Sequence, residues 1–153
     1  MTKLHKIIKK AEWRGRRLII ISNFVQMDSK RVILALGTNV NQERNMKQVR
    51  RLLVNTWPDM KFTTTKWTQP IGIASDLFYN CLAYTKVEET LEELTEKVKN
   101  MEHLCGNTEA ERSLNRIQMD IDILLYGDNK LHKDDWQRDY VQELMKEIDF
   151  LKH

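Results

Sequence analysis

Two spacings of apolar residues along the chain predict its secondary structure. Continuous or alternating apolar runs predict strands at residues 31–36, 61–68, 78–85 and 118–127. Apolar residues three and four positions apart predict helices over 41–56, 91–105 and 140–151. The order β-α-β-β-α-β is that of the ferredoxin-like motif. We therefore predict an α+β fold, with a ferredoxin-like antiparallel sheet, helices packed on one face and an extra C-terminal helix.

Short polar signals mark the ends of the second predicted helix. Thr90 and Glu93 have the spacing of a capping box at its start, and Gly106-Asn107 is a plausible stop. Residues 107–117 are polar, and we expect a mobile loop there.

The first thirty residues have a different pattern from the rest. A block of Lys and Arg precedes a short apolar run, 18–21. The run is short and no small-residue cleavage site follows, so we do not expect a secretion signal. We predict a basic N-terminal extension over 1–30, with 1–26 forming a loosely docked helix, a disordered arm or a segment before a natural start at Met27. Residues 31–153 are then one domain.

Composition narrows the class of protein. The chain has 153 residues, 41% hydrophobic and 31% charged, which is ordinary for one globular domain. A net charge of +3 is too small to indicate nucleic acid, but it suits an anionic small molecule. No apolar run approaches the roughly 20 residues of a membrane span. Cys81 and Cys105 fall in strand and helix patterns, which favours core packing and a reducing, cytoplasmic compartment.

The strand predicted at 118–127 carries the most informative polar residues. Side chains alternate along a strand, so Asp120 and Asp122 share a face with Gln118, roughly 7 Å apart. The other face is apolar: Met119, Ile121, Ile123 and Leu125. Two such carboxylates repel each other unless a cation lies between them, and Mg²⁺ with oxygen ligands would serve. The simpler interpretation is a half-exposed strand whose polar face happens to hold two Asp.

Four stretches, in this order and spacing, resemble a known family. They are Ala35-Leu36-Gly37-Thr38-Asn39, Thr68-Gln69-Pro70-Ile71-Gly72, Phe78-Tyr79-Asn80 and the segment from Met119 to Gly127 (MDIDILLYG). The last is similar to the signature strand of the 6-hydroxymethyl-7,8-dihydropterin pyrophosphokinase family. The resemblance covers roughly residues 31–127.

The resemblance implies an activity and a set of site residues. Enzymes of this family move pyrophosphate from ATP to the hydroxymethyl group of the pterin, release AMP and serve tetrahydrofolate biosynthesis. Two Mg²⁺ ions would bind the catalytic pair, Asp120 and Asp122. Substrate contacts would come from Phe78 and Asn80, with backbone groups around Thr68 and Ile71 completing the pterin slot. Glu102 matches an acidic position of the family's nucleotide site. Without the resemblance, Phe78 is more simply a core aromatic and Glu102 a solvated helix charge. Trp67 is a packing group or an edge of the pocket.

The chain departs from the family pattern after the second predicted helix. The family's nucleotide loop carries several Arg, whereas this loop retains Arg112 and Arg116, both out of register. We expect both to be phosphate ligands, with Arg116 catalytic and Arg112 nucleotide-binding. Arg138 and Tyr140 resemble a later Arg and aromatic of the family and would bind the nucleotide. His132 and Lys133 are candidates to replace lost phosphate contacts.

Two alternatives to the enzyme remain open from the sequence. The Arg-poor loop fits a non-catalytic relative that binds a pterin or a nucleotide. A ferredoxin-like domain that binds RNA through its sheet is the other, although Asp120 and Asp122 on that face would repel phosphate. For the enzyme we expect ATP and the pterin as partners, no nucleic acid, no membrane and a monomeric chain.

Overall fold

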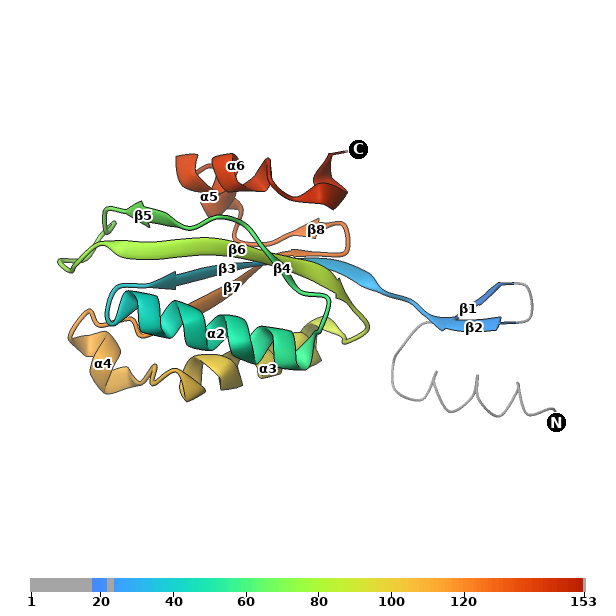
Figure 1. The fold of residues 1–153 in the computed structure, drawn as a ribbon, viewed down its shortest axis with the longest axis horizontal. Coiled ribbons are helices and arrows are strands. Elements are labelled where there is room, and N and C mark those ends of the chain that lie inside the picture. The colour runs from blue at the N-terminus through green and yellow to red at the C-terminus, as the bar shows by residue number, and fades with distance from the viewer. Residues whose placement is uncertain (1–17, 22–23, 153) are drawn as a thin grey trace.

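Strand β3 (Lys30–Thr38) is the centre of the main sheet in the computed structural model, which describes residues 18–21 and 24–152. It pairs antiparallel with β6 (Phe78–Val87) on one side and with β7 (Asp120–Tyr126) on the other. Figure 1 shows these three strands side by side.

Short strands complete both edges of this sheet. The strands β4 (Lys61–Phe62) and β5 (Lys66–Thr68) both pair antiparallel with β6, and β8 (Asn129–Lys130) pairs antiparallel with β7. Within the described residues the sheet has six strands, in the order β4-β6-β3-β7-β8 with β5 also on β6. The predicted α+β fold with an antiparallel ferredoxin-like sheet is confirmed.

Helices cover both faces of the sheet (Figure 1). The helices α2 (Gln42–Thr56) and α3 (Leu91–Leu104) lie on one face, close to their predicted positions. The predicted capping box of α3 is present: Thr90 Oγ1 accepts a hydrogen bond from the Glu93 amide, and the Glu93 side chain accepts one from the Thr90 amide, both at 3.2 Å.

The opposite face is covered by the C-terminal elements α5 (Lys133–Trp136) and α6 (Asp139–Met145). The last helix is shorter than the predicted 140–151. Ile148 has an extended backbone (φ −85°, ψ 116°), which interrupts the helix, and a 3₁₀ turn, Asp149–Leu151, follows. The apolar positions of the predicted helix are nonetheless buried, Val141 and Leu144 in α6 and Ile148 after it.

Strands β1 (Leu18–Ile21) and β2 (Phe24–Met27) form a separate two-stranded antiparallel sheet that the sequence pattern did not lead us to predict. Residues 1–17 lie outside the described part of the chain. We expect a helix, an arm or a segment before a natural start over residues 1–26. The strands at 18–21 and 24–27 are not helical, and for residues 1–17 and 22–23 the expectation stays a prediction.

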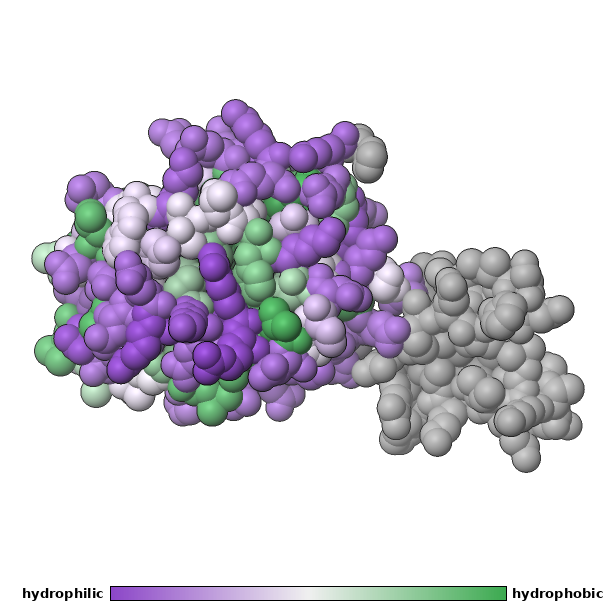
Figure 2. All heavy atoms as spheres, viewed as in Figure 1, coloured by the Kyte–Doolittle hydropathy of each residue, from purple (hydrophilic) through white to green (hydrophobic). Residues whose placement is uncertain are grey.

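The surface seen in Figure 2 is mostly hydrophilic, with small separate apolar areas. Among the described residues, Ile71 and Leu114 are the most exposed large apolar side chains, at 72% and 69%. Scattered apolar side chains of this kind are normal on a protein surface. None of the helices in the described segments is both long enough and apolar enough to cross a bilayer.

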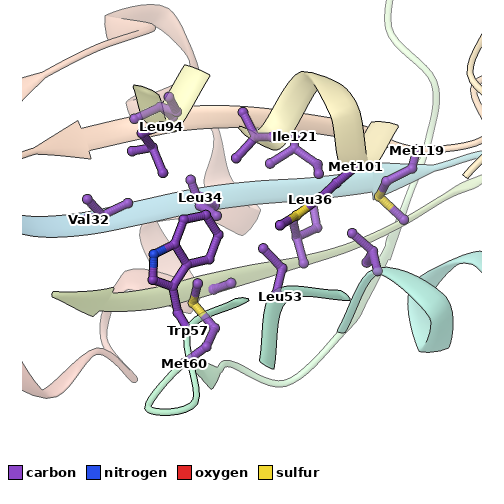
Figure 3. Close-up of a cluster of buried hydrophobic side chains, with 14 of the residues drawn as sticks. Val32, Leu34, Leu36, Leu53, Trp57, Met60, Leu94, Met101, Met119 and Ile121 are labelled. Carbon is purple, nitrogen blue, oxygen red and sulfur yellow. The ribbon is translucent and has the colours of Figure 1, made fainter. Parts of the chain in front are cut away.

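The larger core lies between the sheet and the α2–α3 layer (Figure 3). Side chains from β3 and β7 meet those of the two helices there, and Figure 3 labels Val32, Leu34, Leu36, Leu53, Trp57, Met60, Leu94, Met101, Met119 and Ile121. A second core between the sheet and α6 is smaller. Because it covers only part of that face, the rest of the face is available for a site.

A β-bulge in β7 contradicts one detail of the predicted strand. Ile33 lies opposite Leu125 and Leu34 lies opposite Ile123, so Leu124 is an extra residue in the pairing. The alternation of faces therefore changes at Leu124. Leu125 packs in the core under α6, and the prediction that it shares the face of Ile121 and Ile123 is wrong.

Two other segments differ from the predicted structure. The segment 107–117 contains a short helix, α4 (Glu109–Ser113), whose N-terminus is capped by Thr108 Oγ1 accepting from the Glu111 amide at 3.2 Å. The single strand predicted over 61–68 is divided in two, and between its halves the Thr63 amide donates to the Leu82 carbonyl at 2.9 Å.

Candidate active site

Asp120 and Asp122 lie on the sheet face opposite α2 and α3, as the alternation of β7 predicts up to the bulge. Their partners across the ladder are Gly37 and Ala35 on β3, both small residues that leave space above them. Burial, and next the neighbouring Asp120 carboxylate, raise the pKa of Asp122 above its ordinary value. A positive charge beside Asp122 would oppose this shift.

A cavity of about 160 Å³ lies directly above this pair. Its lining joins three strands, the loop after β5 and the start of α6: Ala35, Leu36, Gly37, Ile71, Phe78, Asn80, Asp120, Asp122, Arg138 and Tyr140. The structure thus brings the predicted substrate residues Ile71, Phe78 and Asn80 together with the two carboxylates.

The amide of Asn80 is fixed in orientation inside the first cavity. Its side chain is almost buried, and Nδ2 donates to Thr68 Oγ1 at 2.8 Å and to the Lys66 carbonyl at 3.2 Å. These acceptors hold the nitrogen toward β5, so Oδ1 lies on the side of Gly37. Asn80 therefore offers a hydrogen-bond acceptor to a ligand, and Thr68 acts by orienting the amide rather than by lining the cavity.

Arg138 and Tyr140 also line this first cavity, beside the predicted pterin residues. The Arg138 guanidinium lies 4.7 Å from the centroid of the Tyr140 ring, a cation–π contact. Burial raises the pKa of the Tyr140 hydroxyl, so it remains a neutral donor. Their predicted role in nucleotide binding stays a prediction, because the residues expected beside them, Glu102 and Arg112, line a different cavity.

The second cavity, of about 430 Å³, lies along the other side of the carboxylate pair, between α3 and β7. It combines apolar and charged side chains: Leu91, Thr95, Val98, Lys99, Glu102, Arg112, Asp120, Ile121, Asp122, Ile123, Leu131 and His132. Asp120 and Asp122 are common to both cavities. A group bound at the pair can therefore touch ligands in both.

Glu102 is more than a solvated helix charge. Its Oε2 accepts a hydrogen bond from the Ile121 amide at 2.9 Å, so it holds β7 next to the first Asp. Burial raises the pKa of the Glu102 carboxyl, and the Ile121 hydrogen bond opposes that shift.

The two Arg of the loop after α3 have different partners. Arg112 Nη2 lies 2.6 Å from Asp120 Oδ1 and 4.0 Å from Glu102 Oε2. Arg116 Nε instead lies 2.6 Å from Glu111 Oε2, and Arg116 lines neither cavity. The structure therefore brings Arg112 to the carboxylate pair but not Arg116, whose catalytic role stays a prediction.

Two other residues from the sequence analysis are placed by the structure. Trp67 is half exposed, its ring packs on Tyr79 with ring centroids 4.4 Å apart, and it lines neither cavity. His132 lines the second cavity, where its charge lowers the pKa of Asp122 against the effect of burial.

Asn39 is a positioning residue to which the sequence analysis gave no role. Its Oδ1 accepts from the Ile117 amide at 2.6 Å, and its Nδ2 donates to the Asn115 carbonyl at 2.7 Å. These bonds tie the loop that carries Arg112 to the end of β3. The sequence signal that could have identified Asn39 is its position: it is a polar residue just after a buried apolar strand, within a stretch that resembles the family.

The structure thus combines a ferredoxin-like domain with a carboxylate pair shared by two cavities. The chain belongs to the 7,8-dihydro-6-hydroxymethylpterin-pyrophosphokinase family, whose model matches residues 33–150. A comparison with curated proteins finds none that matches this chain. The resemblance drawn from the four sequence stretches is confirmed at the level of the family.

Proposed function

We propose that this protein transfers pyrophosphate from ATP to 6-hydroxymethyl-7,8-dihydropterin, giving AMP, as a step of tetrahydrofolate biosynthesis. The observation that carries the proposal is the position of Asp120 and Asp122, which line both the small cavity of Asn80 and the larger cavity of Glu102 and Arg112. Two substrates bound in the two cavities would meet at the carboxylates.

The first cavity has the chemistry to hold a pterin. Phe78 supplies an aromatic surface for a flat ring. Asn80 Oδ1 is positioned to accept a hydrogen bond, and the amide-like edge of a pterin carries N–H groups that donate one. Ile71, although exposed without ligand, lines the mouth of this cavity and would gain an apolar neighbour on binding.

The second cavity suits a nucleotide. Its apolar side chains offer a surface for a base, and Arg112 offers a guanidinium for phosphate oxygens. Arg112 lies on α4 beside Asp120, so a triphosphate bound to Arg112 would be close to the carboxylate pair.

In this reaction the residues mainly position the two substrates. The hydroxymethyl oxygen of the pterin forms a bond to the β-phosphorus of ATP. The bond between that phosphorus and the oxygen bridging to the α-phosphorus breaks, and this oxygen leaves with AMP. The proton of the hydroxymethyl group passes to solvent or to a carboxylate. No covalent intermediate with the protein is required.

The carboxylate pair fits divalent cations. Asp120 and Asp122 project from one face of one strand, and burial, followed by the Asp120 carboxylate, raises the pKa of Asp122, a shift that a nearby cation would oppose. Across the described segments, His, Cys, Asp and Glu residues form no group of three arranged to hold a metal, so the remaining ligands would be phosphate oxygens and water, as Mg²⁺ prefers. When bound, Mg²⁺ would neutralise the triphosphate charge between the two substrates.

A non-catalytic relative is the second candidate, and the pairing of the loop arginines favours it. Arg112 is engaged by Asp120 and Arg116 by Glu111, which leaves few cations directed at a triphosphate in this arrangement. This candidate binds a pterin or a nucleotide and produces no AMP.

AMP release separates the two candidates. Purified protein would be mixed with ATP, Mg²⁺ and 6-hydroxymethyl-7,8-dihydropterin, and AMP quantified with and without the pterin. Asp120→Asn and Asp122→Asn keep the shape of each side chain and remove its charge. Asp128→Asn, on the turn after β7, is the matched control, because its carboxylate is fully exposed and pairs only with Arg31 among the described residues.

Pterin-dependent AMP that both site variants lose and Asp128→Asn retains is the expected result. If the wild-type protein binds the pterin but releases no AMP, the proposed enzyme activity is overturned and the non-catalytic candidate is supported.

A further inference from the structure

The cation that contacts Asp120 in this structure belongs to the chain itself. Arg112 Nη2 lies 2.6 Å from Asp120 Oδ1, a charge-assisted contact, and the same nitrogen lies 4.0 Å from Glu102 Oε2. Asp122, two residues further along β7, lines both cavities with Asp120. One guanidinium therefore occupies the carboxylate where a divalent cation would bind.

We propose that Arg112 is an internal counter-ion that holds Asp120 until a triphosphate draws the guanidinium away, so that divalent cation and nucleotide bind together and not separately. The proposal rests on the proposed function for the identity of the triphosphate. The competition between Arg112 and the cation rests on the contact with Asp120 alone.

The segment that carries Arg112 is fixed at both ends. At its start, Thr108 Oγ1 caps α4, and the Arg112 amide donates to the Thr108 carbonyl at 3.0 Å. At its end, Asn39 binds Ile117 and Asn115. Held in this way, Arg112 loses less conformational freedom on contacting Asp120 than an Arg on an unrestrained loop would.

The same contact determines what can displace Arg112. Arg112 Nη2 lies 2.6 Å from Asp120 Oδ1, so a divalent cation at Asp120 would share that carboxylate with the guanidinium. The two positive charges would repel each other. Phosphate oxygens offer the guanidinium an alternative set of paired acceptors. A triphosphate that takes Arg112 therefore frees Asp120, and by linkage the cation favours the triphosphate by the same factor.

Binding of Mn²⁺ to protein without nucleotide tests the competition directly. The free ion would be followed by electron paramagnetic resonance in a titration of wild type and Arg112→Gln. We expect the variant to bind Mn²⁺ about tenfold more tightly, which corresponds to about 1.4 kcal/mol. Adding α,β-methylene-ATP, whose scissile linkage cannot be cleaved, should tighten Mn²⁺ binding in wild type by a larger factor than in Arg112→Gln.

Arg116→Gln is the matched control for the charge. The substitution removes one positive charge from the same loop, but Arg116 pairs with Glu111 and not with Asp120 or Asp122. We expect its Mn²⁺ affinity to stay at the wild-type value. Arg112→Lys, which keeps the charge, should return the affinity most of the way to wild type, and Arg112→Met repeats the test without the hydrogen-bonding amide of Gln.

Unchanged or weaker Mn²⁺ binding in both Arg112→Gln and Arg112→Met would overturn the proposal, and so would equal tightening in Arg116→Gln. These titrations contain no pterin and need no turnover. A protein that releases no AMP would therefore still give a decisive answer about Arg112.

Discussion

Replacing Gly37 by Ala should weaken pterin binding by acting on Asn80. A Cβ atom at position 37 would lie 3.0 Å from Asn80 Oδ1 and 3.8 Å from Phe78 Cδ1. The amide has little freedom to retreat, because Nδ2 already donates to Thr68 and Lys66 on the other side. Accommodating the methyl group therefore displaces the acceptor that a pterin would use.

The expected cost is about one neutral hydrogen bond. Such a bond contributes about 1 kcal/mol, which corresponds to about a fivefold weaker affinity. The free energy of unfolding should change less, because Ala in a strand is favoured over Gly by roughly 0.5 kcal/mol and this offsets part of the strain. Binding and stability are therefore expected to separate.

The assay is a fluorescence titration with 6-hydroxymethylpterin in the presence of Mg²⁺ and α,β-methylene-ATP, with urea unfolding of each variant in parallel. A double-mutant cycle with Asn80→Ala identifies the route of the effect. If Gly37→Ala acts through Asn80, it should cost nothing further in the Asn80→Ala background. Wild-type affinity in Gly37→Ala, or an equal loss in both backgrounds, would refute the reasoning.

Two further predictions concern the loop anchor and the thiols. Asn39→Ala should lower the free energy of unfolding by about 1–3 kcal/mol, because it leaves the buried Ile117 amide unpaired. Gln42→Ala removes a half-buried side chain whose acceptors are the Asn39 and Leu77 carbonyls, and it should have a smaller effect in the same urea titration. Burial raises the pKa of Cys105 to about 11 from 9.0, and it also raises the pKa of Cys81. At pH 8 the Cys105 thiolate should therefore be about a hundredfold scarcer than in the unfolded chain, and Ellman's reagent should react slowly until urea is added. Rapid labelling of both thiols in the folded protein would contradict this expectation. Because the folded chain retains this proton to higher pH, the contribution of Cys105 to the free energy of unfolding is fully present below pH 9 and should be lost as the pH rises toward 11.

The fold was predictable because its core elements carry strong local patterns. The strands β3 and β6 are long apolar runs, and α3 has both an apolar stripe and a capping box. The position of Asp120 and Asp122 followed from simple alternation. That alternation failed at Leu125, because the bulge is set by pairing with β3 and the sequence of β7 alone contains no sign of it.

The elements that were missed are short and depend on contacts. Helix α4 has five residues and no apolar stripe, although Thr108 and Glu111 had the spacing of a cap. The sequence presents Arg112 and Arg116 as equivalent loop cations. Only the folded loop separates them, by directing one to Asp120 and the other to Glu111.

The central place of β3 has a consequence for synthesis of the chain. Leu36 of β3 pairs with Cys81 of β6 on one side and with Ile121 of β7 on the other. The site residues of β6 and those of β7 are therefore held together by β3. A nascent chain that has made β6 but not β7 already contains Phe78 and Asn80, but one long side of β3 has no partner. An unpaired apolar strand edge of this kind readily recruits other chains. Ribosomal pausing before residue 120 would therefore expose the chain to aggregation, and completion of β7 both closes that edge and delivers the two carboxylates.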